Sequence, residues 1–164
     1  MVIMKQITLH LPKNFSSVIV KQNTINGYIY DTLTSTNSQA WQLRQENIKP
    51  PFVVIAKQQT AGKGQRGNIW RSPIGGLYFS IVLELNLPVE FISHLTLFSV
   101  YGIVMELRKF EIPIEIKWLN DLILEGKKLG GILCETKSDG KIIKEVIIGV
   151  GINYKNEIPE GRIS

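Results

Sequence analysis

Two glycine-containing turns divide the last third of the chain into three short strands, and this feature limits the possible folds most. Glu125-Gly126 separates residues 121–124 from residues 128–135, and Asp139-Gly140 separates the latter from residues 141–152. An Asp-Gly pair between apolar stretches is a strong signal for a β-hairpin. Because consecutive hairpins pair their strands antiparallel, these residues predict an antiparallel meander.

Two segments have the residue spacing of helices. Apolar residues recur at spacings of three and four from Ile92 to Leu107, after Pro88, which predicts a helix of about four turns. A second helix, capped by Ser35 or Asn37, is expected to have Ala40 on its apolar side. Together with about seven short strands, these helices predict an α+β fold: a mixed, largely antiparallel sheet with helices on one face.

The composition is that of an ordinary soluble globular protein, with 44% apolar and 20% charged residues. No apolar run approaches the length needed to cross a bilayer, and residues 1–4 are too short for a signal-peptide core, so we expect a cytoplasmic protein without membrane association. The single cysteine, Cys134, excludes an intramolecular disulfide and a cysteine-cluster metal site. The net charge of +5 favours anionic ligands or partners. Nucleic acid is not expected, because no helix-turn-helix and no basic run interleaved with aromatics is present.

Residues 62–67 combine three glycines with two basic side chains. Glycines allow backbone amides to approach a phosphate closely, and Lys63 and Arg66 add positive charge. The spacing is neither that of a P-loop nor that of a dinucleotide fingerprint. Taken alone, such a loop is more often a solvated turn.

Three further segments place glycines or polar side chains in or beside strands. Residues 117–121 read Lys-Trp-Leu-Asn-Asp, residues 127–133 place two lysines before Gly130-Gly131, and residues 148–153 alternate glycines before Asn153. Glycines inside a strand often mark the close approach of a ligand, and a lysine beside such a gap could hold a carboxylate and a phosphate together. Each segment also has an ordinary interpretation: a turn, a charged hairpin with a bulge, or a small-residue strand packed under a helix.

These motifs, in this order, resemble the biotin–protein ligase family. The matching segments are Ser35-Thr36-Asn37, Gln59-Thr60-Ala61-Gly62-Lys63-Gly64-Gln65-Arg66-Gly67 with Trp70, Lys117-Trp118-Leu119-Asn120-Asp121, Lys128-Leu129-Gly130-Gly131-Ile132-Leu133-Cys134-Glu135 and Gly149-Val150-Gly151-Ile152-Asn153. The resemblance implies a fold like that of class II aminoacyl-tRNA synthetases. It also implies a ligase that forms an amide bond in two steps. Biotin's carboxylate attacks the α-phosphate of Mg-ATP, giving biotinyl-adenylate and pyrophosphate, and a lysine of a biotin carboxyl carrier protein then attacks the mixed anhydride, releasing AMP.

The resemblance further implies a role for each motif. The biotin-binding set combines neutral polar side chains for the ureido ring with a loop and a lysine for the carboxylate: Ser35, Thr36, Asn37, Gln59, Lys63, Gly64, Gln65 and Lys128. The ATP-binding set, with the tryptophan near adenine, is Lys63, Arg66, Trp70, Lys117, Asn120 and Asn153. The catalytic set is Lys128, Lys63, Arg66 and Asp121, and Asp121 either helps to hold magnesium or accepts the proton of the acceptor lysine.

The chain departs from the family pattern in several respects. Lys63 and Gln65 stand where the family has arginines, and Leu119 replaces a proline. The family continues with further helices and a small SH3-like barrel, whereas we expect residues 1–164 to form a single catalytic domain without it. We expect no DNA-binding domain before the motifs, so the resemblance does not imply repressor activity. Three alternatives stay open: a lipoate- or octanoate-transferring relative, a shortened remnant that binds biotin or a carrier without turnover, and a basic nucleic-acid-binding module.

Overall fold

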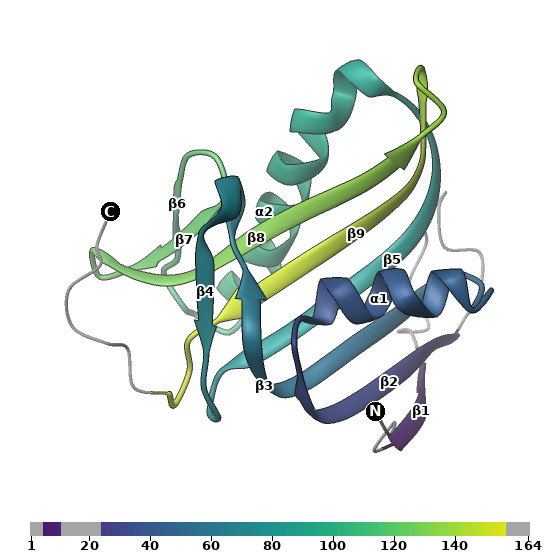
Figure 1. Cartoon of the computed structure of the whole chain (residues 1–164). Coiled ribbons are helices and arrows are strands. Elements are labelled where there is room, and N and C mark those ends of the chain that lie inside the picture. Colours follow the sequence, from purple (N-terminus) through teal and green to yellow (C-terminus); the bar gives the residue numbers. More distant parts are fainter. Residues whose placement is uncertain (1–4, 11–23, 157–164) are drawn as a thin grey trace.

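The structure describes residues 5–10 and 24–156, which form a nine-stranded sheet, two α-helices and two short 3-10 helices, Gln65–Gly67 and Val89–Phe91 (Figure 1). The structure is a computed structural model. The other residues of the expected domain, 1–4, 11–23 and 157–164, lie outside the described residues. The helices are α1 (Thr36–Gln45) and α2 (Ile92–Arg108), and the strands are β1 (Lys5–His10), β2 (Thr24–Leu33), β3 (Phe52–Lys63), β4 (Ile69–Ser72), β5 (Leu77–Pro88), β6 (Glu115–Lys117), β7 (Asp121–Leu124), β8 (Lys127–Ser138) and β9 (Ile142–Ile152).

The sheet is mixed and largely antiparallel, as predicted. Its strand order is β1-β2-β3-β5-β9-β8-β7-β6, and β4 pairs with β3. Only β2 and β3 pair parallel among these strands, and α1 connects them. The meander β7-β8-β9 is confirmed, and both of its turns place a glycine at positive φ, Gly126 at 73° and Gly140 at 99°. The second turn is further stabilised by Asp139, whose carboxylate accepts the backbone N–H groups of Lys141 and Ile142.

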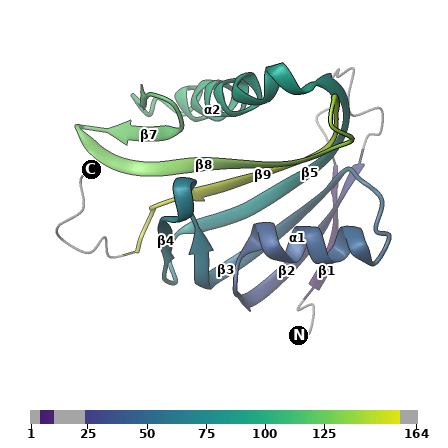
Figure 2. The ribbon, with the colours of Figure 1, turned by 45° about the horizontal axis from the view of Figure 1, so that its top comes forward.

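The two helices lie on opposite faces of the sheet, so the prediction that they share one face is wrong (Figure 2). Helix α1 packs with a cluster that includes Ile147 of β9, whereas α2 packs with a cluster that includes Ile148 and Val150 of the same strand. Successive side chains of a strand point to opposite faces. The neighbouring pair Ile147 and Ile148 therefore requires apolar cover on both sides, and one helix supplies each.

Helix α2 leaves its outer side exposed. Phe98 and Tyr101 are 66% and 56% exposed, while Thr96, Val100 and Val104 face the sheet and are buried. The segment Val89–Arg108 is long and apolar enough, by length and composition alone, to cross a membrane, a feature that the sequence analysis did not identify. The inner side of this helix packs against the apolar face of the sheet.

An ion pair fastens the C-terminal end of α1 to β9. Arg44 donates to both carboxylate oxygens of Glu145 at 2.9 Å, and the two side chains are only 18% and 13% exposed. It also donates to the carbonyl of Ile48 at 2.6 Å. The Arg44 hydrogen bonds hold the pKa of Glu145 below its usual 4.5.

Glu145→Gln is therefore expected to lower the free energy of unfolding by about 2 kcal/mol at pH 7. Because the folded-state pKa of Glu145 is lowered, this contribution is present above pH 4.5 and is lost as the pH falls through the folded-state pKa. Urea unfolding of both proteins between pH 7 and pH 3 measures the difference. A difference that does not shrink at low pH would contradict the assignment, and Glu84→Gln, at an exposed carboxylate 3.8 Å from Arg44, is the control expected to change little.

Candidate active site

A cleft of about 880 Å³ opens on the face of the sheet that carries α1. Strands β8 and β9 form its floor, and the β3–β4 hairpin and the β6–β7 turn stand at its sides (Figure 1). All five sequence motifs reach it. Every residue of the predicted site lines the cleft: Ser35, Thr36, Asn37, Gln59, Lys63, Gly64, Gln65, Arg66, Trp70, Lys117, Asn120, Asp121, Lys128 and Asn153.

Two glycines of β9 make the floor flat enough for side chains to lie on it. A Cβ at Gly149 would collide with the side-chain amide of Asn37, and a Cβ at Gly151 would collide with the indole of Trp70. At Gly131 of β8 the nearest side-chain atoms would be 3.6 Å away, an ordinary contact. The packing of Asn37 and Trp70 thus requires the two glycines of β9, whereas a small group would fit over Gly131 without a clash.

One end of the cleft is polar, uncharged and buried. Ser35, Thr36 and Asn37 are 2%, 4% and 3% exposed. Ser35 is at the N-cap position of α1 without a capping side-chain bond. The side-chain oxygen of Gln59 accepts the backbone N–H of Thr36 at 2.7 Å and its hydroxyl at 3.2 Å. The hydroxyl of Ser80 lies 2.6 Å from Oδ1 of Asn37 and donates to it. This end therefore presents fixed donors and acceptors rather than charges.

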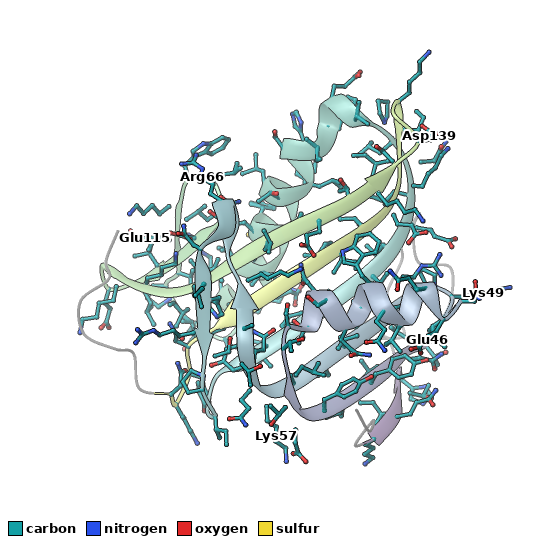
Figure 3. All side chains as sticks on the ribbon, viewed as in Figure 1. Glu46, Lys49, Lys57, Arg66, Glu115 and Asp139 are labelled. Carbon is teal, nitrogen blue, oxygen red and sulfur yellow. The ribbon has the colours of Figure 1, made fainter. Side chains whose placement is uncertain are left out.

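The other end of the cleft is cationic. Its lining includes five basic side chains, Lys63, Arg66, Arg71, Lys117 and Lys128, against the single carboxylate of Asp121. Such an excess creates a positive potential in a concave site and attracts anions. The tip of the β3–β4 hairpin carries Arg66 at φ 55°, visible at the top of the hairpin in Figure 3.

Lys128 lies at the cationic end between Asp121 and Trp70. Its Nζ lies 2.8 Å from Oδ1 of Asp121 and 5.4 Å from the centroid of the Trp70 ring. The indole N–H of Trp70 is buried and has no hydrogen-bond partner within the described ranges. The ion pair with Asp121 accordingly holds the Lys128 ammonium over the cleft floor.

The asparagines predicted to meet the nucleotide also hold β8 in place. The side-chain amide of Asn120 donates to the backbone carbonyl of Ile132 at 3.0 Å, and the backbone carbonyl of Asn120 accepts the N–H of Ile132. The backbone N–H of Asn153 donates to the carbonyl of Leu129 at 2.7 Å. Asn156, a lining residue that the sequence reasoning missed, donates to Oδ1 of Asn153 at 2.8 Å. These contacts shape the cleft whatever ligand it holds.

Glu135 is the most informative of the missed residues. It stood inside a matched motif but received no role. In the structure its Oε2 accepts from Nδ2 of Asn37 at 3.0 Å and from Nε1 of Trp41 at 3.2 Å, and its Oε1 lies 3.5 Å from Nζ of Lys63. The available signal was a carboxylate directly after the apolar run Ile132-Leu133-Cys134 of a strand, where a partly buried charge needs partners. Ser80 and Arg71 were also missed.

The cleft has no ready-made metal site. Among residues 5–10 and 24–156, no group of three or more His, Cys, Asp or Glu side chains could hold a metal ion. Magnesium that arrives with nucleotide phosphates needs only one or two protein carboxylates. Asp121 is the one lining carboxylate, and it is already paired with Lys128. Magnesium would therefore enter this cleft with the phosphates of a nucleotide, as Mg-ATP.

The fold and the cleft define an α+β domain in which a buried, uncharged hydrogen-bonding pocket continues into a cationic one. Comparison with known proteins gives the family. Residues 29–153 match the family model described as the Biotin/lipoate A/B protein ligase family, and the chain belongs to this family.

The most similar relatives include two bacterial proteins and one solved structure. The Bifunctional ligase/repressor BirA of Bacillus subtilis is 35% identical over 136 residues, which are 80% of this chain and 42% of the relative. The Biotin–[acetyl-CoA-carboxylase] ligase of Paracoccus denitrificans is 31% identical over 135 residues, 79% of this chain and 55% of the relative. The structure of the biotin protein ligase from Aquifex aeolicus in complex with biotin and ATP superimposes with a TM-score of 0.66 at 35% identity, covering 82% of this chain and 55% of that one. The chain thus spans about half the length of these relatives.

Proposed function

We propose that this domain activates biotin with Mg-ATP to biotinyl-adenylate and transfers the biotinyl group to a lysine of a biotin carboxyl carrier protein in the cytoplasm. The observation that carries the proposal is the two-part cleft. Biotin has a neutral cyclic urea at one end and a carboxylate at the other. The buried Thr36–Asn37–Gln59 end matches the urea, which must exchange its hydrogen bonds with water for hydrogen bonds with the protein.

The cationic end would carry out the activation. The biotin carboxylate and the α-phosphate are both anionic and repel each other. Lys128 and Lys63 lower this repulsion, and preorganised charges of this kind stabilise the transition state without rearranging. Gly64 and Gln65 complete the loop over the two reacting groups.

The remaining side chains would hold the nucleotide. Arg66 and Lys117 supply charge for its phosphates, Trp70 supplies an aromatic surface for adenine, and Asn120 and Asn153 form the wall beside them. Asp121 orients Lys128 through their ion pair. It is also the one carboxylate in the cleft lining that could contact magnesium or accept the proton of the acceptor lysine.

A lipoate-transferring activity is the second candidate, because the family includes lipoate ligases by its description. The dithiolane ring of lipoate has no N–H or C=O group. It could therefore gain no hydrogen bonds from the buried polar groups around Thr36 and Asn37, whereas the urea of biotin could use their remaining donor and acceptor capacity. The polar pocket therefore favours biotin.

Pyrophosphate release tests the proposed function. The protein is mixed with ATP and magnesium, and either biotin or lipoate is added. Release is expected with biotin and not with lipoate. Equal release with lipoate would favour the second candidate, and biotin binding by calorimetry without any release would show a binding domain that does not turn over.

Gln65→Arg is expected to slow the escape of biotinyl-adenylate by a few-fold to about tenfold. Arginine offers a charged, forked contact to a phosphate where glutamine offers a neutral amide, and charge-assisted hydrogen bonds contribute about 1.5–3 kcal/mol against about 1. The measurement is adenylate dissociation, together with the biotin incorporated into an added non-carrier protein. Unchanged dissociation and unchanged labelling would mean that Lys63 or Arg66 already covers the phosphate.

A further inference from the structure

A carboxylate lies directly behind the uncharged end of the cleft. Glu135 of β8 is outside the cleft lining, yet it joins α1 and the β3–β4 hairpin: its Oε2 accepts from Asn37 at 3.0 Å and from Trp41 at 3.2 Å, and its Oε1 lies 3.5 Å from Nζ of Lys63. We propose that Glu135 is a positioning residue that orients the Asn37 amide, so that Asn37 offers an acceptor to an N–H group of the ligand. The inference rests on the proposed function. It adds that Glu135, through Asn37, selects ligands whose head group carries N–H donors.

Among the described hydrogen-bond partners of Asn37, only Glu135 distinguishes the oxygen from the nitrogen of its side-chain amide. Ser80 also bonds Asn37, but a hydroxyl can donate or accept and would serve either orientation. A carboxylate only accepts, so it requires Nδ2 of Asn37 to face Glu135. Oδ1 is thereby directed toward Ser80 and Gly149, which forms the cleft floor.

The same carboxylate is placed to act differently on the other end of the cleft. Its contact with Lys63 is long, and the two side chains are 28% and 44% exposed, so it contributes little to stability. Its negative charge nevertheless opposes the attraction of Lys63 for an anion. Removing that charge should weaken the urea end of the site without weakening its phosphate end, whereas a general loss of structure would weaken both.

Glu135→Gln tests the inference, because it keeps the size of the side chain and lets residue 135 donate as well as accept. Calorimetry on the full chain should give about tenfold weaker biotin binding, as expected when a charged partner no longer selects one amide orientation. ATP binding should be unchanged or tighter. Biotin affinity within twofold of wild type, or equal losses for biotin and ATP, would overturn the inference.

Glu145→Gln is the matched control. It makes the same substitution on the neighbouring strand β9. Glu145 also anchors α1, through Arg44, but it does not line the cleft. It should lower stability and leave biotin affinity unchanged. In an Asn37→Ala background, Glu135→Gln should change biotin affinity by less than about twofold, because its effect passes through Asn37. Fully additive losses would contradict that route.

A readout without ligand separates this inference from the proposed function. In the free protein the Asn37 side-chain NH₂ should give one sharp pair of NMR signals, identified by its absence in Asn37→Ala, and Glu135→Gln should broaden or double it. Unchanged signals would overturn the positioning role even if wild type binds biotin. Failure of wild type to bind biotin, with the NMR effect present, would instead remove the proposed function and with it the assigned ligand.

Discussion

Lys128→Ala is expected to slow biotin-dependent pyrophosphate release by about two to three orders of magnitude, the usual effect of removing a preorganised electrostatic stabiliser. Nζ of Lys128 is held 2.8 Å from Asp121 in the lining of the cationic end. Without it, the carboxylate of Asp121 faces the biotin carboxylate and the α-phosphate unpaired, so repulsion is added where attraction was lost. Single-turnover pyrophosphate release is the measurement.

Lys127→Ala is the control for this prediction. Lys127 precedes Lys128, is exposed, and does not line the cleft. The same loss of net charge at this position should leave the rate nearly unchanged. Lys128→Ala with near-normal release, or Lys127→Ala with an equal loss, would show that Lys128 has no particular role beyond the overall charge.

Gly149→Ala is expected to weaken biotin binding by about 10- to 100-fold. The added Cβ would collide with the amide of Asn37, which cannot move away easily because Ser80 and Glu135 both bond it. Overpacking a filled site costs about 1–3 kcal/mol, which agrees with the expected loss of affinity. Calorimetry with biotin measures it, with circular dichroism to verify the fold.

Gly102→Ala provides the comparison for Gly149→Ala. Gly102 lies on α2, on the opposite face of the sheet, and a Cβ there would meet no atom within 4 Å beyond the backbone of its own helix. Biotin affinity should therefore stay at the wild-type value. If Gly149→Ala bound biotin as tightly as Gly102→Ala, Asn37 would not be held where the structure shows it.

The meander and the long helix could be predicted from the sequence because their signals are local. Gly126 and Gly140 adopt the positive φ that their turns require, and a turn acts on the strands immediately beside it. The helix predicted from Ile92 to Leu107 occupies Ile92–Arg108, since its periodic apolar residues lie within one segment. The glycine-rich segment was read as a loop, whereas β3 extends to Lys63 through a register shift between Gln59 and Gly62. A bulge of this kind depends on the pairing with β4.

The sequence determined five motifs and their order, and the site residues were predicted from the resemblance of these motifs to the biotin–protein ligase family. The structure brings all of them to one cleft. The faces covered by the two helices were decided only by tertiary structure. The pair Ile147-Ile148 indicates that both faces of β9 are buried but does not say by which element. The contact between Asn37 and Glu135 joins residues 98 positions apart and has no local signal. Local turn and helix preferences act over a few residues, whereas the direction of a side-chain amide depends on which strand the folded sheet places behind it.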